Sequence, residues 1–324
     1  MKINLDLIRD WKDGICARLL YMVKVGEVSF KQNPRLQKIL KNGAKGGVSE
    51  QEKWDMVRWY YNWRDRIPKC RPREVKLCKD VTIPSECKEG WERLHQALVG
   101  GKDLRPWMSN RSSELDYFDA MYRYWRIFHF HIGEMKNGYV ERTGPIAYCY
   151  FDEQTCYLIA VEGHKHWADP DLIERLNGTY PDVLKKFECA DEGYAIDCAT
   201  KEYEEMRKHR VNAIEKIGDK RYVFIGGPVS MDGNAGSVWR DLRGFENWLK
   251  NAESIIRDQE NAIGVELTRF VGEIDVLSLR LEEANMQTVA ALSLSPNIRI
   301  VLNKLDGGRV SYTLQVSKGQ IKER

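Results

Sequence analysis

The sequence predicts an α+β protein. Some stretches place apolar residues at helical spacing, as do Ile8, Trp11 and Leu19, whereas others, such as Thr155 to Glu162, have the length and composition of strands. Of the 324 residues, 43% are hydrophobic and 31% are charged, which excludes disordered and low-complexity classes. A chain of this length is expected to form two or three domains.

Three consecutive regions are expected. Residues 1–84 form a basic, mostly helical region, residues 85–190 a central α+β domain, and residues 191–324 a C-terminal domain of helices packed on an antiparallel sheet. The first boundary is placed between Pro68 and Pro84, because three prolines interrupt the helical periodicity there.

The charge is unevenly distributed. Residues 1–80 contain 19 Lys and Arg against 10 Asp and Glu, a net charge of +9, whereas the whole chain carries +3. This asymmetry predicts an anionic partner for the basic region, RNA or DNA.

The N-terminal region is expected to contain a helix with Met56, Trp59 and Trp63 on one face, preceded by the basic loop Asn42 to Gly47. Ser49 and Glu52 form a predicted capping box for this helix. Tryptophans and tyrosines near its end could stack bases while cations hold the backbone. The predicted nucleic-acid contacts are Lys45, Arg58, Arg64 and Arg66. The alternative is a helix whose tryptophans are buried in the core and whose arginines are solvated.

The central region begins with a helix from Lys88 to Val99, ended by Gly100-Gly101. After a short helical stretch that carries Tyr117, Met121 and Tyr124, three strands are expected. They are Arg126 to Ile132, Ile146 to Phe151 and Thr155 to Glu162, with a tight hairpin at Asp152-Glu153-Gln154, and they form an antiparallel meander followed by a helix from Asp171 to Leu176.

The C-terminal region is expected to start with a helix from about Lys201 to Ile217 and a strand from Arg221 to Ile225. The glycine-rich loop Gly226 to Gly236 follows, and Ser237 is the expected cap of a long helix. The loop either binds a phosphate at the helix N-terminus or is an ordinary connection, since it lacks the P-loop and dinucleotide-binding spacings.

Half-buried antiparallel strands are expected at the end of the chain, where apolar and polar residues alternate. The alternating apolar residues are Leu277, Leu279 and Leu281; Ile298, Ile300 and Leu302; and Val310, Tyr312, Leu314 and Val316. Asp306-Gly307-Gly308 predicts a hairpin between the last two strands.

Four of the six histidines form two H-x-H pairs. On a strand, His129 and His131 would share one face with Ile127, while Phe128 and Phe130 point to the other face. If the second pair closes the same sheet, the imidazoles could move protons during phosphodiester cleavage or ligate a metal, as in a metal-dependent hydrolase. The predicted catalytic residues are His129, His131, Arg142, His164 and His166, and Lys165 is a further nucleic-acid contact. The alternative is that these histidines are hydrogen-bonded structural residues.

No metal site and no cofactor are predicted, because no Asp, Glu or Cys stands at a spacing that completes the histidine pairs. The eight cysteines are scattered and are expected to be reduced thiols. Cys70, Cys78 and Cys87 make only a weak zinc candidate, because no C-x2-4-C pair is present.

Residues 122–176 resemble the RelE/ParE superfamily of bacterial toxins. The resemblance lies in the order of Trp125 to Gly133, Arg142 to Asp152 and Thr155 to His164, with a Gly-His step after the third strand. The stretch is also similar to uncharacterised bacterial proteins with a W-x-x-x-H-x-H-x-G pattern. This resemblance implies a RelE-like central fold, in whose ribonuclease members basic residues, a tyrosine and sometimes a histidine carry RNA cleavage. The chain departs from the family in its length, its flanking regions and its histidine content.

Together these observations predict a toxin-like, metal-independent endoribonuclease with a role in bacterial stress response or phage defence. The alternative is a non-catalytic module that binds nucleic acid or a protein, with the C-terminal strands offering an edge for a homodimer. Without a signal peptide or a run of about 20 apolar residues, the chain is expected to be cytoplasmic and to have no membrane partner.

Overall fold

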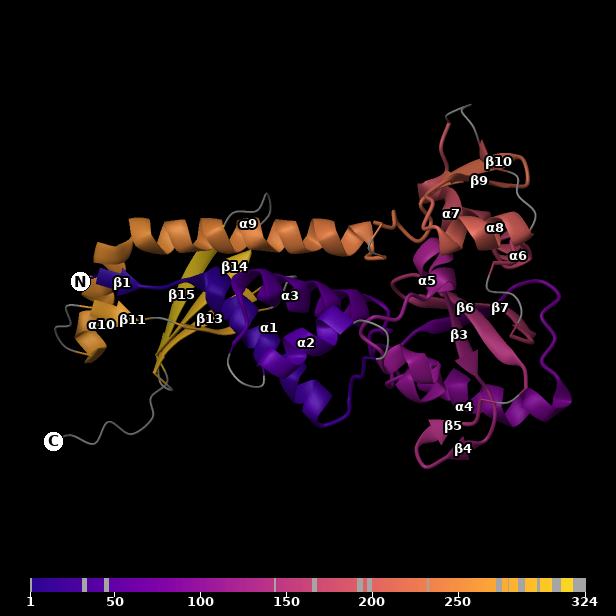
Figure 1. Ribbon diagram of the computed structural model, residues 1–324, viewed down its shortest axis with the longest axis horizontal. Helices are drawn as coiled ribbons and strands as arrows, with labels where there is room; N and C mark the ends of the chain where they lie inside the picture. Colours follow the sequence, from indigo (N-terminus) through magenta and orange to yellow (C-terminus); the bar gives the residue numbers. More distant parts are fainter. Residues whose placement is uncertain are drawn as a thin grey trace. The chain divides into compact units, whose positions relative to one another are not determined.

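The computed structural model describes residues 2–30, 34–43, 47–142, 144–164, 168–190, 195–196, 200–231, 233–271, 276–278, 280–284, 289–295, 298–304 and 310–316. The protein is an α+β fold, as predicted. The chain divides into two compact units, each built from separated segments (Figure 1). The first unit comprises residues 1–25, 34–58 and 239–324, and the second comprises residues 26–33 and 59–238.

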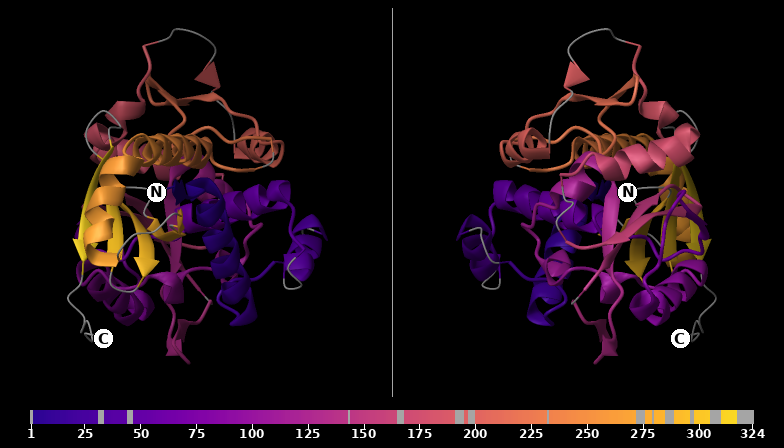
Figure 2. Two further views of the ribbon diagram at one scale, coloured as in Figure 1. Left: turned by 90° about the vertical axis from the view of Figure 1, so that its left-hand side faces the viewer. Right: turned by 90° about the vertical axis from the view of Figure 1, so that its right-hand side faces the viewer.

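The first unit combines N-terminal helices with the C-terminal sheet. Its helices are α1 (Leu7–Lys24), α2 (Pro34–Gly43), the first part of α3 (Glu50–Asp65), most of α9 (Gly236–Asp258) and α10 (Glu260–Val271). Its sheet has the antiparallel order β12 (Arg280–Ala284), β13 (Val289–Ser295), β14 (Ile298–Lys304) and β15 (Val310–Val316). Figure 2 shows these strands in yellow, with α10 in orange.

Contacts between distant parts of the chain hold the first unit together. The strand β1 (Lys2–Asn4) pairs in parallel with β11 (Val276–Ser278). The buried ring of Trp11 on α1 lies 5.2 Å from that of Phe245 on α9, centroid to centroid, and 5.7 Å from that of Trp54 on α3. The core of this unit therefore depends on residues that are far apart in the sequence.

The second unit is organised by a four-stranded mixed sheet with the order β2–β7–β6–β3. The strands are β2 (Glu74–Leu77), β3 (Ile127–His131), β6 (Ile146–Phe151) and β7 (Thr155–Glu162). The last three form the predicted antiparallel meander, whereas β2 pairs in parallel with β7.

The other elements of the second unit surround this sheet. They are α4 (Lys88–Val99), α5 (Ala120–Trp125), α6 (Asp171–Thr179), α7 (Pro181–Leu184), α8 (Thr200–Lys208), the hairpin of β4 (Met135–Lys136) with β5 (Tyr139–Val140), a small sheet of β8 (Ala195–Ile196), β9 (Ile214–Ile217) and β10 (Lys220–Val223), and the short 3-10 turns Ser85–Cys87, Arg105–Trp107, Asn110–Ser113 and Lys185–Phe187.

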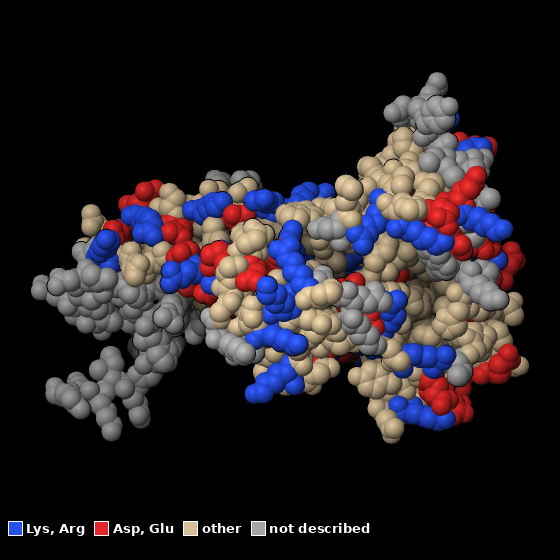
Figure 3. Space-filling model, in the orientation of Figure 1, with Lys and Arg blue, Asp and Glu red and all other residues tan. Residues whose placement is uncertain are grey.

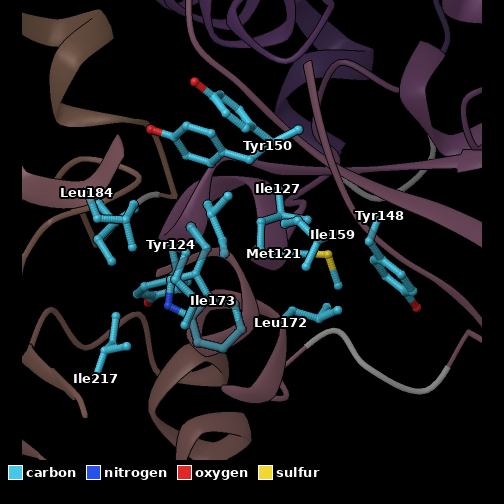
Figure 4. Packing of buried hydrophobic residues seen from close by; sticks show 14 of the residues in the cluster. Met121, Tyr124, Ile127, Tyr148, Tyr150, Ile159, Leu172, Ile173, Leu184 and Ile217 are labelled. Carbon is cyan, nitrogen blue, oxygen red and sulfur yellow. The ribbon is translucent and has the colours of Figure 1, made fainter. Parts of the chain in front are cut away.

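One face of the mixed sheet carries the main core of the second unit. Ile127, Tyr148 and Tyr150 of the sheet are buried together with Leu172 and Ile173 of α6 (Figure 4). Because side chains alternate between the two faces of a strand, His129 and His131 of β3 lie on the same face as Ile127.

The expected boundary between residues 68 and 84 is wrong. Residues 74–77 form β2, an integral strand of the mixed sheet, and residues 1–25 belong to the same unit as the C-terminal sheet. Residues 195–238, assigned to a C-terminal domain, belong to the second unit. The prolines between residues 68 and 84 do interrupt the helical pattern, but the segment forms an edge strand of the sheet and not a linker between domains.

Two further predicted boundaries are wrong, and three predicted elements are confirmed. The predicted helix from Lys201 to Ile217 is too long, because α8 ends at Lys208 and residues 214–217 form β9 in a hairpin with β10. Gly218 has a φ of +60° in the turn of this hairpin, a conformation that suits glycine. Ser237 does not cap α9, which begins at Gly236. The predicted α4, β6 and β7 are confirmed at both ends.

Candidate functional site

The strand β3 presents His129 and His131 on the face that also carries Ile127. On the other face, the ring of Phe128 lies 4.9 Å from that of Phe151, and the ring of Phe130 lies 5.8 Å from it. These aromatic contacts fix the pleat of β3 and so determine which face the two imidazoles occupy.

Three of the four histidines from the H-x-H pairs lie together. The ring centroids of His129 and His131 are 6.3 Å apart, and those of His131 and His164 are 5.1 Å apart. His164 follows β7, and the hydroxyl of Tyr148 on β6 donates a 2.7 Å hydrogen bond to the carbonyl of Gly163 just before it. His166 and Lys165 lie outside the described residues.

His131 is the buried member of this cluster, with 3% of its surface exposed. Its Nδ1 atom has no hydrogen-bond partner within the described part of the chain. Burial, followed by the charges of His129, His164 and Arg142, lowers the pKa of His131 to about 3. His131 is therefore neutral at pH 7 and does not serve as a proton donor there.

His129 and His164 open into a cleft with a volume of about 390 Å³. Burial and the charge of His129 lower the pKa of His164 below its usual value. The ionisable or hydroxyl-bearing residues that line the cleft are Arg111, Tyr117, Asp119, His129, Tyr148, His164, Arg207 and Lys208. Two imidazoles thus share one opening with three cations and one carboxylate.

The three cations of the cleft come from two separated segments. Arg111 forms a 3.2 Å ion pair with Glu114, and its guanidinium lies 4.2 Å from the ring centroid of Tyr117. Lys208 is half-exposed at the end of α8 and pairs with Glu205 at 2.6 Å. Asp119 is occupied as the N-cap of α5, where it accepts from the backbone N–H of Tyr122. The cleft lining itself carries three cations and one carboxylate, and this excess of positive charge attracts an anionic ligand, which would share Arg111 and Lys208 with Glu114 and Glu205.

Arg207 is the buried cation beneath the cleft. Its guanidinium lies 3.7 Å from the ring centroid of Trp125, and burial lowers its pKa to about 10. It therefore remains charged at pH 7. Sequence reasoning missed Arg111, Arg207 and Lys208, although the basic run from Arg207 to Arg210 was a usable signal. That run was assigned to another domain, and only the tertiary fold brings it to the histidines.

Arg142 is held away from the cleft lining. Its Nη2 atom donates a 3.1 Å hydrogen bond to the carbonyl of Met108, and burial lowers its pKa. Arg142 nevertheless influences the site, because its charge contributes to the low pKa of His131.

The predicted nucleic-acid contact at Arg66 is wrong, because this side chain is buried. Its Nη2 atom donates a 2.7 Å hydrogen bond to the carbonyl of Glu114, and burial lowers its pKa to about 10. Trp63 is also buried, and its indole N–H donates to the carbonyl of Ser112. Trp63 fits the alternative, in which the tryptophans are buried in the core, whereas buried Arg66 fits neither interpretation, because the alternative expected solvated arginines.

The other predicted contacts of this region differ from Arg66. Arg64 is exposed. Arg58 forms an ion pair with the buried Asp55, and its guanidinium lies 5.0 Å from the ring centroid of Trp239. Lys45 lies outside the described residues. The capping box is present, since Ser49 N–H donates to Glu52 at 2.8 Å and Glu52 N–H donates to the Ser49 hydroxyl at 3.3 Å.

The glycine-rich loop is held by hydrogen bonds within the second unit. The N–H of Gly226 donates to the carbonyl of Tyr124 at 2.7 Å, and that of Gly236 donates to the carbonyl of Pro228 at 2.6 Å. Val229 N–H donates to the side chain of Asn212. These backbone donors are already used, which favours the ordinary connection over a phosphate-binding loop.

Among the described residues, no group of three or more His, Cys, Asp or Glu is arranged to hold a metal ion. Cys70 is exposed, whereas Cys78 and Cys87 are buried, and all the described cysteines are free thiols. In the same part of the chain, no helix combines the length and apolar character needed to cross a bilayer.

No protein-family model, curated protein or solved structure matches the chain. Its function is therefore inferred from the geometry of the cleft. Two accessible imidazoles can accept a proton from an attacking hydroxyl and donate one to the leaving oxygen of a bound phosphodiester, while the neighbouring cations offset its negative charge.

Proposed function

We propose that this protein is a metal-independent endoribonuclease and that the cleft beside β3 is its active site. The observation that carries the proposal is the meeting of His129 and His164 with Arg111 and Lys208 at one opening. The two histidines supply the acid and the base, and the two cations bind the phosphate.

In this mechanism His164 acts as the base and His129 as the acid. The lowered pKa of His164 favours its neutral form, which accepts the proton of an RNA 2′-hydroxyl. The 2′-oxygen bonds to phosphorus as the bond from phosphorus to the 5′-oxygen breaks, and protonated His129 donates its proton to the leaving 5′-oxygen. The products are a 2′,3′-cyclic phosphate and a 5′-hydroxyl. Arg111 and Lys208 stabilise the additional negative charge on the phosphoryl oxygens.

The other buried groups of the site have positioning roles. His131 contacts the ring of His164 and, being neutral, does not repel its protonated form. Tyr148 holds the segment before His164 through Gly163. Among the five residues predicted as catalytic, the proposed mechanism assigns proton transfer to His129 and His164 and a positioning role to His131.

The resemblance to the RelE/ParE superfamily supports the same function. The antiparallel order of β3, β6 and β7 agrees with the strand order on which that resemblance rests. A toxin-like role in bacterial stress or defence and a cytoplasmic location follow from the resemblance, and we include them in the proposal.

The proposal is tested by cleavage of single-stranded RNA by the purified protein in EDTA. We expect a cyclic-phosphate product, and we expect His129→Ala and His164→Ala each to lower the rate by about 100-fold or more. His95→Ala is the matched control, because this histidine lies on α4 beside Trp91 and outside the cleft lining. Its rate should equal that of the wild type.

Three results would contradict the proposal. Cleavage that occurs only after addition of a divalent metal would rule out the metal-independent mechanism. Equal rates in the wild type and both histidine variants would show that the activity is not located in this cleft. A protein that binds RNA in a strongly salt-dependent manner without cleaving it would favour the non-catalytic binding module.

A further inference from the structure

The helix α2 has a basic exposed face and no acidic residue. Arg35, Lys38 and Lys41 are spaced three residues apart and are exposed, whereas the opposite face of the helix is buried. Arg35 forms an ion pair with Asp55. In the described part of the chain, Lys38 and Lys41 form no ion pair, so their charges remain available to a ligand.

The second half of α1 continues this pattern. Arg18, Tyr21 and Lys24 are also three residues apart and exposed, and no Asp or Glu occurs between Gly14 and Lys24. Tyr21 lies between these two cations and has 61% of its surface exposed, which is high for an aromatic side chain. An exposed ring in this setting is available for stacking.

The two helices pack against each other within the first unit. Gly43 at the end of α2 lies close to the side chain of Leu20 on α1, and the helices share further contacts. Figure 3 shows Lys and Arg side chains gathered over α1 and α2. We name this area the α1–α2 surface and define it by Arg18, Tyr21, Lys24, Arg35, Lys38 and Lys41.

We propose that the α1–α2 surface binds the phosphate backbone of single-stranded RNA. The spaced cations provide sequence-independent attraction to phosphates, and Tyr21 provides a stacking platform for one base. In a duplex the base faces are stacked on each other and cannot contact Tyr21. A single strand can therefore use both the cations and Tyr21, whereas a duplex can use only the cations. This inference rests on the proposed function in taking RNA as the ligand, but it requires no cleavage.

Binding is measured with a fluorescent single-stranded 2′-O-methyl oligonucleotide. This probe lacks the attacking hydroxyl, so the result is independent of whether the protein is a nuclease. The affinity of the full chain is followed over a range of salt concentrations. Each phosphate contact contributes about 0.7 to the slope of log affinity against log salt for a single strand.

We expect Lys38→Gln combined with Lys41→Gln to reduce this slope by about 1.4, which corresponds to the loss of two phosphate contacts. The matched control is Arg240→Gln combined with Lys250→Gln on α9, which removes the same charge outside the α1–α2 surface. Its slope should equal that of the wild type. Tyr21→Ala should weaken binding about fivefold or more without changing the slope.

An equal slope for the α2 double variant and the α9 control would overturn the inference. Binding to vesicles that contain anionic lipid, with no binding to the oligonucleotide, would also overturn it and assign the surface to a membrane. Failure of this inference can be distinguished from failure of the proposed nuclease activity. If the protein cleaves no RNA but the α2 double variant still reduces the slope, the α1–α2 surface remains an RNA-binding site.

Discussion

The imidazole rings of His131 and His164 lie 5.1 Å apart, one at the end of β3 and the other just after β7. The two histidines have the same chemistry but different surroundings, and the surroundings give them different roles. Burial keeps His131 neutral, whereas His164 reaches the cleft and can exchange protons.

The low pKa of His131 predicts a stability that depends on pH. Below the usual pKa of 6.5, the unfolded chain binds a proton at this residue that the folded protein excludes. The stability contributed by neutral His131 is therefore complete above pH 6.5 and is lost as the pH falls toward 3. We expect the free energy of unfolding to fall by about 1–2 kcal/mol between pH 7 and pH 5 because of this group.

Urea unfolding at both pH values checks this expectation, with His131→Leu as the comparison. The variant lacks the titrating group and replaces an Nδ1 atom that has no partner among the described residues with apolar surface, so its stability at pH 7 should remain within about 1 kcal/mol of the wild type. If the variant loses stability at pH 5 as much as the wild type does, His131 is not the responsible group.

Substitution of Arg66 should reduce stability much more than substitution of Arg64. Arg66→Gln removes a buried cation that donates to the carbonyl of Glu114 and lies 5.5 Å from the ring centroid of Tyr117, and we expect a loss of about 2–4 kcal/mol. Arg64→Gln changes an exposed side chain and should alter stability by less than about 0.5 kcal/mol. Thermal and urea unfolding of the two variants measure the difference, and similar values would contradict the structural role of Arg66.

Gly226 should not tolerate a side chain. A Cβ atom at this position would lie 2.0 Å from the carbonyl oxygen of Arg123, so the loop or α5 would have to move. We expect Gly226→Ala to destabilise the protein by about 3 kcal/mol or more. Gly178→Ala is the control, because a Cβ there meets nothing within 4 Å and alanine favours the end of α6, so stability should be unchanged or slightly higher. Equal effects in urea unfolding would show that the close approach is absent.

Asp65 should be essential for the stability of the second unit. Its carboxylate accepts from Arg123 at 2.6 Å and from Arg126 at 3.0 Å, and Arg123 is almost fully buried. Asp65→Asn leaves this buried cation without its counter-charge, and we expect a loss of about 3–5 kcal/mol. Asp182→Asn on α7 changes an exposed carboxylate and serves as the control. Calorimetric unfolding that shows no difference between the two variants would contradict this role.

Local patterns in the sequence predicted several elements of the second unit well. The helix α4 and the strands β6 and β7 have the predicted ends, because apolar periodicity, glycine pairs and a polar hairpin act over neighbouring residues. Such patterns contain no information about which distant strand completes a sheet. The parallel pairing of β2 with β7 and that of β1 with β11 were therefore missed.

The same distinction between local and long-range information applies to the residues of the candidate site. The alternating sequence of β3 by itself determined that His129 and His131 share a face, because side chains alternate on any strand. Only the tertiary structure decided that His164 joins them, that His131 is buried, and that Arg111 and Lys208 complete the cleft. Burial and charge pairing arise from residues far apart in the chain, and the packing that brings these residues together leaves no local signature.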